Sequence, residues 1–277
     1  MIIRIPVLGV AAAVLLASFS SQACTPAIAE QDLIAPGKLQ LSINPTNPPQ
    51  QYVDKDGTLQ GLNVELASEL GKRLCLDVEL VRMDFPSMIP AMNAGRIDGM
   101  NTGMFWTAER SRLMYLVPYS VQSVSVVARP DDAKPLASLE ALAGTSVAVE
   151  VNSYQLSFLQ KQNEALAARG LAKMELRTFP TATNVVAAMF ARQVDHAALV
   201  DSVARDLVQR KRVAEVLSGQ GVSRTAMAFR NRAVAEAVAG ALNGMRTDGH
   251  YQVLFDRFGL TPLPAQDAIQ IDGPGPT

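Results

Sequence analysis

The spacing of apolar residues changes from segment to segment along this 277-residue chain, and it predicts alternating strands and helices. Leu62, Leu66, Leu70 and Leu74 recur every four residues, the period of an amphipathic helix. Residues 38–43 alternate between polar and apolar, which is typical of a strand. Further strands are expected at 78–81, 98–105, 123–128, 146–151, 171–178, 197–200 and 226–229, and further helices at 86–93, 154–169, 183–191, after 201, at 231–248 and at 251–258. This alternation predicts an α/β protein with a mostly open sheet in each unit.

A short apolar run opens the chain. Arg4 is the only charge before that run, which is too short to span a membrane. The pattern predicts a signal peptide over residues 1–29 and a periplasmic location for the mature protein. Cleavage before Cys24 and cleavage before Glu30 both fit the small residues that precede them. Lipidation of Cys24 is a third outcome, although Ser21 departs from the branched aliphatic residue that a lipoprotein site normally has.

Composition and charge exclude several classes of function. The 25 basic and 26 acidic residues nearly balance, so no basic surface for nucleic acid is expected. If Cys24 is removed or lipidated, Cys75 is left alone, so we expect no intrachain disulfide in the mature chain. His196 and His250 have no partners at the spacing of a metal site or a catalytic triad. The glycines form neither a P-loop nor a dinucleotide-binding pattern, and no cofactor is expected.

Two segments echo each other about one hundred residues apart. Residues 95–98 (Gly-Arg-Ile-Asp) and 192–195 (Arg-Gln-Val-Asp) each follow a predicted helix and precede an apolar strand. Two similar lobes explain this repetition economically.

The order of segments between Pro48 and Tyr119 closely resembles the extracellular solute-binding proteins of ABC importers, in the family that captures polar amino acids. The resemblance rests on the segment from Gly61 to Leu74, the turn at 95–98 and the Thr-Ala-Glu-Arg motif at 107–110. It implies a two-lobed fold of the type II periplasmic-binding-protein kind, with two hinge crossings. Lobe one would comprise residues 38–122 plus 229–262, lobe two residues 123–228, and residues 263–277 would form a loose tail.

The resemblance also implies a ligand site between the lobes. Arg110 closes the T-x-x-R motif, and its planar guanidinium can pair with a carboxylate in bidentate fashion. Asp201, after a strand of lobe two, would accept from the ligand ammonium. Gly103 and Ser153 stand at positions that hold the polar head of the ligand. Read individually, Arg110 could be a surface arginine and Asp201 a cap of the following helix.

Three positions depart from the family pattern. Phe105 stands where a hydroxyl residue is usual, Asn47 where a stacking aromatic is usual, and Tyr154 where a small residue is usual. Glu150 lies two residues before the lobe-two loop motif and could pair with a cationic ligand end, with Phe105 and Tyr154 as a partial aromatic cage. A solvated glutamate at a strand end is the alternative. Trp106 points to the opposite face of its strand and is expected in the lobe-one core.

These features predict a monomeric binding protein and not an enzyme. It would capture a small zwitterion, an amino acid or a derivative of one, and deliver it to an ABC permease. Two alternatives stay open. One is a cyclohexadienyl or arogenate dehydratase on the same fold, a chemistry that needs a general acid, for which no residue stands out in the sequence. The other is a ligand-sensing partner of a membrane receptor.

Overall fold

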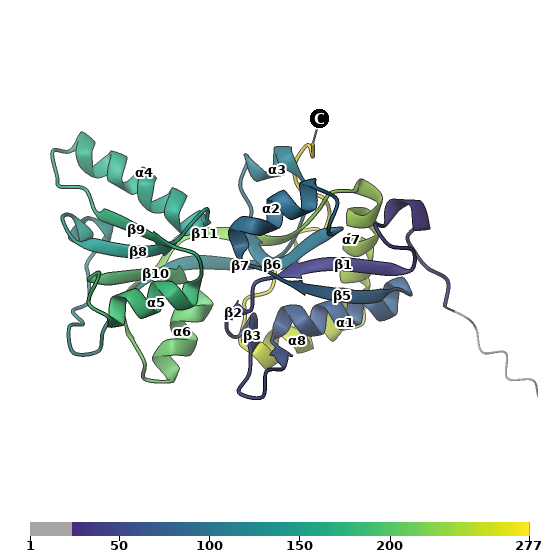
Figure 1. Ribbon diagram of the computed structural model, residues 1–277, viewed down its shortest axis with the longest axis horizontal. Coiled ribbons are helices and arrows are strands. Elements are labelled where there is room, and N and C mark those ends of the chain that lie inside the picture. Colours follow the sequence, from purple (N-terminus) through teal and green to yellow (C-terminus); the bar gives the residue numbers. More distant parts are fainter. Residues whose placement is uncertain (1–23, 277) are drawn as a thin grey trace, which may run out of the picture.

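The protein forms two lobes joined by two long strands that run side by side through the centre of the molecule (Figure 1). The computed structural model describes residues 24–276. The predicted signal peptide over 1–29 therefore lies mostly outside the described residues. Within residues 24–276, no helix has both the length and the apolar character needed to cross a membrane. The same residues hold no cluster of histidine, cysteine, aspartate and glutamate suited to a metal ion.

The first lobe contains the sheet order β5-β1-β6-β11-β7. Strands β1, β5 and β6 run parallel, so their carboxyl ends meet at one edge of the sheet. Before the second lobe in the chain, this lobe contains β1 (Lys38–Ile43), α1 (Leu62–Leu74), β5 (Asp77–Arg82), α2 (Phe85–Asn93), β6 (Gly99–Phe105) and α3 (Arg110–Leu113). After the second lobe it contains α7 (Arg232–Thr247) and α8 (His250–Phe258). The η1 turn (Glu30–Asp32) lies beside this lobe near the N-terminal end.

Helix α1 has the bounds that its leucine spacing predicts. Leu62, Leu66, Leu70 and Leu74 are each at most 2% exposed, and they pack in the main apolar core with residues of β1, α7 and α8. The helix ends at Cys75, whose backbone is left-handed (φ 56°) and whose N–H donates to the carbonyl of Gly71. The four-residue spacing thus brings one apolar stripe onto the sheet.

The second lobe repeats the same plan. Its strands β8, β9 and β10 are parallel, and β10 pairs with β7 in antiparallel fashion. Its elements are η2 (Leu139–Leu142), β8 (Ser146–Glu150), α4 (Tyr154–Ala168), β9 (Glu175–Phe179), α5 (Ala182–Phe190), β10 (His196–Val200) and α6 (Asp201–Gln209). The predicted strand at 171–178 begins only at Glu175 in the structure. The α/β fold and its two lobes are as predicted.

Two strands belong to both lobes, β7 (Tyr115–Ala128) and β11 (Ala214–Phe229). They pair antiparallel and join both halves into one eight-stranded sheet. The sequence indicated only their ends, 123–128 and 226–229. Polar and glycine residues interrupt the apolar pattern of β11, where Gly219 and Gly221 have positive φ and the register shifts several times. Periodicity is lost at such irregularities.

A small second sheet was not predicted. Its strands β2 (Thr46–Asn47), β3 (Gln51–Val53) and β4 (Leu59–Gln60) are too short to show a period in the sequence. They lie between β1 and α1 in the chain, and they carry polar residues to the space between the lobes.

The expectation of a loose tail over 263–277 is wrong for the described part of the tail. Ile269 is 1% exposed in the lobe-one core, and Arg246 of α7 donates to the carbonyls of Leu263 and Asp267. The indole Nε1 of Trp106 donates to the carbonyl of Asp272 at 3.0 Å. This segment, although rich in proline and glycine, lies across the surface of lobe one, and side-chain contacts hold it in place.

The expectation of no disulfide is also contradicted. Cys24 and Cys75 form a disulfide with a Cα–Cα distance of 5.5 Å, within the usual range. The expectation failed because it assumed that Cys24 is removed or lipidated. Residues 24–29, assigned to the signal peptide, instead lie against the end of α1, where the N–H of Ala27 donates to the carbonyl of Leu74.

Candidate functional site

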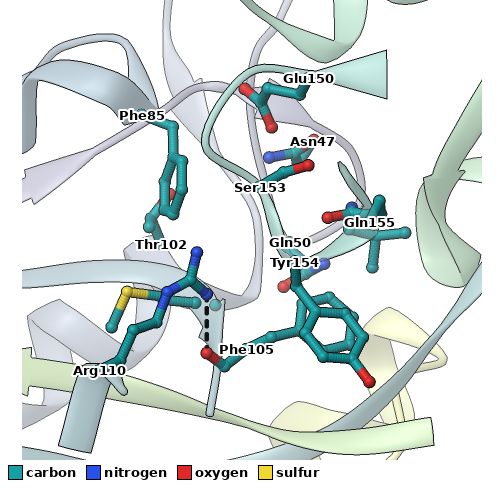
Figure 2. Close-up of a pocket in the computed structure, with 13 residues that line it drawn as sticks. Asn47, Gln50, Phe85, Thr102, Phe105, Arg110, Glu150, Ser153, Tyr154 and Gln155 are labelled. Carbon is teal, nitrogen blue, oxygen red and sulfur yellow. Dashed lines mark hydrogen bonds between the residues drawn. The ribbon is translucent and has the colours of Figure 1, made fainter. Parts of the chain in front are cut away.

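The carboxyl ends of parallel strands from both lobes face each other across one cavity (Figure 2). Ligands of open α/β sheets bind at such strand ends. The free volume of the cavity is about 30 Å³, room for a few water molecules, so the lobes must part to admit a ligand as large as an amino acid. The lining residues are Asn47, Gln50, Phe85, Thr102, Gly103, Met104, Phe105, Arg110, Glu150, Ser153, Tyr154, Gln155 and Val200.

Arg110 reaches this cavity from the start of α3. The hydroxyl of Thr107 accepts from the backbone N–H of Arg110 at 3.1 Å, which fixes the turn that presents the side chain. The guanidinium lies 5.5 Å from the centre of the Phe85 ring. Figure 2 shows both side chains at the cavity. Burial lowers the pKa of Arg110 to about 10, so it stays positively charged at neutral pH.

The guanidinium makes two hydrogen bonds, both to backbone carbonyls. Nη1 donates to Phe105 at 2.8 Å, and Nη2 donates to Asn152 of the other lobe at 3.0 Å. Because arginine has five N–H donors, further donors remain for an anion in the cavity. Within the described residues no carboxylate forms an ion pair with Arg110.

The two predicted cage residues meet across the cleft. Phe105 of lobe one and Tyr154 of lobe two stack with ring centroids 4.5 Å apart and an interplanar angle of 7°. Phe158 extends this stack, 6.2 Å from Tyr154. Figure 2 shows the Phe105 and Tyr154 rings side by side at one end of the cavity. The aromatic surface closes the cleft from both sides.

Position 103 requires glycine because of its backbone conformation. Its φ is +67°, and a Cβ there would overlap the amide oxygen of Gln50. Gln50 is 4% exposed and donates to the hydroxyl of Ser202 at 3.0 Å, from one lobe to the other. A side chain at position 103 would therefore disturb an interlobe hydrogen bond.

Glu150 ends β8 and turns into the cavity. Asn44 of lobe one donates to its carboxyl oxygen at 3.0 Å, a second amide contact between the lobes. Burial raises the pKa of Glu150 to about 7; the Asn44 hydrogen bond lowers it and the charge of Asp84 raises it further. A carboxyl in this position favours a cation beside it, because a positive charge offsets the cost of burying the ionised form.

A buried polar network supports the lobe-one wall. Asn63 of α1 donates to Gln51 at 2.6 Å and accepts from the hydroxyl of Tyr119 at 2.6 Å. Gln51 in turn donates to the carbonyl and the hydroxyl of Thr102. Burial raises the pKa of Tyr119 well above its ordinary range, so its hydroxyl stays protonated as a donor. The network fixes Thr102 and Gly103 beside the cavity.

Ser153 begins helix α4 at the lobe-two wall. Its hydroxyl accepts from the N–H of Leu156 at 3.1 Å and so caps the helix. The first residues of α4, Tyr154 and Gln155, also line the cavity. The amino end of α4 is thus directed at the space beside Arg110, and both favour a negative group there.

Asp201 does not line the cavity. Its carboxylate pairs with Arg205 at 2.9 Å and accepts from the N–H of Ser123 at 3.2 Å, and its side chain is 14% exposed. The preceding residue, Val200, lines the cavity instead. Of the eight predicted site residues, the structure brings seven together (Asn47, Gly103, Phe105, Arg110, Glu150, Ser153 and Tyr154) and leaves Asp201 outside.

Sequence reasoning missed Gln50, Phe85, Thr102, Met104, Gln155 and Val200. Phe85 carried a signal, because it precedes Pro86 at the start of a helix and lies only three residues after the end of strand β5. Gln50 carried none that periodicity can detect, because it lies in the irregular segment before α1.

Known proteins resemble this chain in both sequence and fold. A model of the bacterial extracellular solute-binding proteins, family 3, matches residues 39–261. The histidine-binding periplasmic protein of Escherichia coli K12 is 27% identical over 242 residues, covering 80% of this chain and 88% of that protein. A probable ABC transporter arginine-binding protein, ArtJ of Chlamydia trachomatis, is 26% identical over 171 residues, 61% of this chain and 62% of its own length.

A solved structure shows the same fold. An ancestral arginine-binding protein bound to glutamine superimposes with a TM-score of 0.71 at 27% identity, covering 80% of this chain and 97% of the other. The family model spans most of the chain, from β1 to the residues after α8. The chain belongs to the bacterial extracellular solute-binding proteins, family 3.

Proposed function

We propose that this protein captures a small zwitterion, an amino acid or an amino-acid derivative, between its lobes and delivers it to the permease of an ABC importer. One observation carries the proposal. Among the residues that line the interlobe cavity, Arg110 and Glu150 are the charged ones, and they come from opposite lobes. A ligand with a carboxylate and a positive group can therefore contact both lobes at once.

The carboxylate of the ligand lies at Arg110. The remaining N–H donors of the guanidinium and the amino end of α4 both favour a negative group at this place. The ring of Phe85 lies beside the guanidinium at 5.5 Å, within the range of a cation–π interaction. Bidentate pairing with the ligand carboxylate would give Arg110 the ion-pair partner that it lacks among the described residues.

The positive group of the ligand lies at Glu150. Asp201 was the predicted partner of an ammonium, but its carboxylate is already paired with Arg205. Glu150 has one polar partner, an amide, and Asp84 adds negative potential beside it. The rings of Phe105 and Tyr154 cover each other's faces in this structure, and they become accessible to a cation or a planar group when the lobes part.

Binding then proceeds by closure of the lobes. Hydrogen bonds among the described residues cross the cleft, including those between Asn44 and Glu150, Gln50 and Ser202, and Arg110 and Asn152. A ligand that contacts both walls stabilises the closed form by its differential affinity for that form. The strands β7 and β11 supply the two connections about which the lobes can move.

The proposed setting is the periplasm. The relatives named above are a periplasmic protein and an ABC transporter binding protein, and an exported carrier of the same family serves a membrane permease. The apolar run at the start of the chain fits export. The protein works as a binding protein without turnover and as a monomer.

A thermal-shift screen tests the proposal. The purified protein is heated with free amino acids, opines and quaternary amines, and a ligand that binds the native state raises the melting temperature. The shift should vanish in Arg110→Ala and persist in Arg112→Ala, a control on the exposed side of the same helix. Equal shifts in both variants would refute the role of Arg110. A shift with none of the compounds would refute the ligand class.

One observation favours a second function, the dehydratase. The sequence showed no general acid, but Glu150 is buried with its pKa raised to about 7, as a general acid requires. It could protonate the ring hydroxyl, which leaves as water while the ring carboxylate leaves as carbon dioxide and its bonding electrons complete the aromatic ring; Arg110 would hold the carboxylate of the side chain. Incubation with prephenate and arogenate, followed by detection of the aromatic product, decides this point. Turnover that disappears in Glu150→Gln would establish the enzyme and displace the carrier.

A further inference from the structure

The first described residues are part of the fold of lobe one. Ile28 is 4% exposed and Leu33 is 7% exposed, and both belong to the same apolar core as Leu74 and Leu76. The N–H of Ala27 donates to the carbonyl of Leu74 at 3.0 Å. The segment after Cys24 therefore covers apolar surface that would otherwise face water.

Further contacts hold the same segment down. The N–H of Ile34 donates to Asp98 at 2.9 Å, and Asn231 donates to the carboxylate of Asp32 at 2.8 Å. The segment is thus tied to the turn before β6 and to the start of α7. At its beginning, the disulfide joins Cys24 to Cys75 at the end of α1.

These contacts distinguish the two cleavage positions. Cleavage before Glu30 would remove Cys24 and Ile28, expose part of the core and leave Cys75 unpaired. Cleavage before Cys24 keeps every contact described above. The fate of Cys24 is equally constrained, because its sulfur cannot hold both a disulfide and the thioether of a lipid anchor.

We propose that the mature chain begins at Cys24 and that this N-terminal cysteine is oxidised to Cys75 instead of being acylated. Both thiols lose their hydrogens as the S–S bond forms. The oxidant is a second exported protein that carries a disulfide. This disulfide accepts the two electrons and two protons and is reduced to a pair of thiols. The inference rests on export, as proposed above, and is independent of the ligand. It makes Cys24–Cys75 a modification site that ties the mature N-terminus to the ligand-binding lobe.

Intact-mass spectrometry of the full chain, exported by a bacterial host and purified without reductant, tests the proposal. The expected mass is that of residues 24–277 less two hydrogens. Alkylation should add no label before reduction and two labels after it. A mass that begins at Glu30, a diacylglycerol adduct, or two thiols that react without reduction would each overturn the proposal.

Cys75→Ser is the matched variant. It leaves Cys24 without a partner, so we expect an unacylated chain that begins at Cys24 and takes one label without reduction. Acylation of this variant would contradict the proposal, because it would show that Cys24 lies in a lipidation site. Acylation of both proteins would refute it. Ligand binding by the wild type is measured in parallel, so that a failure of this inference is distinguishable from a failure of the proposed function.

Discussion

At the scale of single residues, the charge and the orientation of each side chain in the site are set by the residues that it contacts. Arg110 could be predicted, because the T-x-x-R motif carries both the residue and the hydroxyl that orients its turn. The role expected for Asp201 stays a prediction, because in this structure Asp201 lies outside the cavity and pairs with Arg205 four residues later on the helix. Glu150 was correctly selected as a cavity residue, but its burial and its contact with Asn44 depend on the packing of two lobes, which no local pattern contains.

The pKa of Glu150 predicts that binding of a cationic ligand depends on pH. Its folded pKa of about 7 lies above the ordinary value, with Asp84 and Arg110 as the nearby charged groups. Below about pH 7 the free protein carries a proton there that a cation must displace, so affinity should rise with pH and level off above it. Calorimetric titration with L-arginine between about pH 5 and about pH 8 measures this slope.

The raised pKa of Glu150 has the opposite effect on stability, which falls as the pH rises. A carboxyl whose pKa is raised on folding contributes stability below its unfolded pKa, and this contribution is lost as pH rises through about 7. Glu150→Gln should therefore remove both dependences. A wild-type affinity for L-arginine that does not change with pH would contradict the assignment of the ligand cation to Glu150.

Paired substitutions separate the two candidate carboxylates. Glu150→Gln should weaken L-arginine binding by roughly 30-fold to 150-fold, because removing one partner of a buried charge pair costs about 2–3 kcal/mol. Asp201→Asn should change affinity by no more than about twofold, since Asp201 faces Arg205 outside the cavity. Titration calorimetry of both variants gives the comparison. The reverse ranking would restore Asp201 as the ammonium partner.

At the scale of elements, helices and strands with a regular apolar period could be predicted from the sequence, whereas irregular segments could not. Helix α1 and strand β1 have the predicted bounds, because one face of each is buried and the pattern is unbroken. The strands β7 and β11 extend well beyond their predicted lengths, through a proline, glycines and register shifts. The tail beyond Thr261 was misjudged because its contacts are made by widely separated partners, such as Arg246 and Trp106.

The disulfide predicts a stability that depends on the redox state. Cys24 and Cys75 are 51 residues apart, and closing a loop of this size stabilises a protein by about 2–4 kcal/mol, mainly through the unfolded chain. Reductant should lower the free energy of unfolding by that amount, which shifts the midpoint of urea unfolding to a lower concentration. In a Cys24→Ser/Cys75→Ser chain, reductant should have no effect. An identical midpoint for oxidised and reduced wild type would contradict a stabilising role.

The tail predicts a loss of stability on truncation. Ending the chain at Pro264 removes Ile269 from the core and leaves Asn243 and Trp106 without their carbonyl partners. We expect a loss of about 3 kcal/mol, from one buried aliphatic side chain and a few hydrogen bonds. Thermal unfolding against a chain that lacks only residues 276 and 277 measures it. A melting temperature equal to that of the control would show that the tail contributes nothing.

At the scale of the whole molecule, two lobes of the same plan place opposite charges across one cleft. The repeated turns at 95–98 and 192–195 indicated this duplication, and both precede central strands of their lobes, β6 and β10. How closely the lobes approach could not be predicted, because it depends on side chains such as Phe105 and Tyr154 that meet only after both lobes have folded. The central claim is that one zwitterion bridges Arg110 and Glu150.

Calorimetric titration with L-arginine and with agmatine, its decarboxylated analogue, tests that claim most directly. The wild type should bind L-arginine at least about tenfold more tightly, because agmatine leaves Arg110 without its charge-assisted hydrogen bonds. In Arg110→Ala this preference should disappear, while Arg112→Ala should retain it. An equal preference in Arg110→Ala, or no binding of L-arginine by the wild type, would contradict the account.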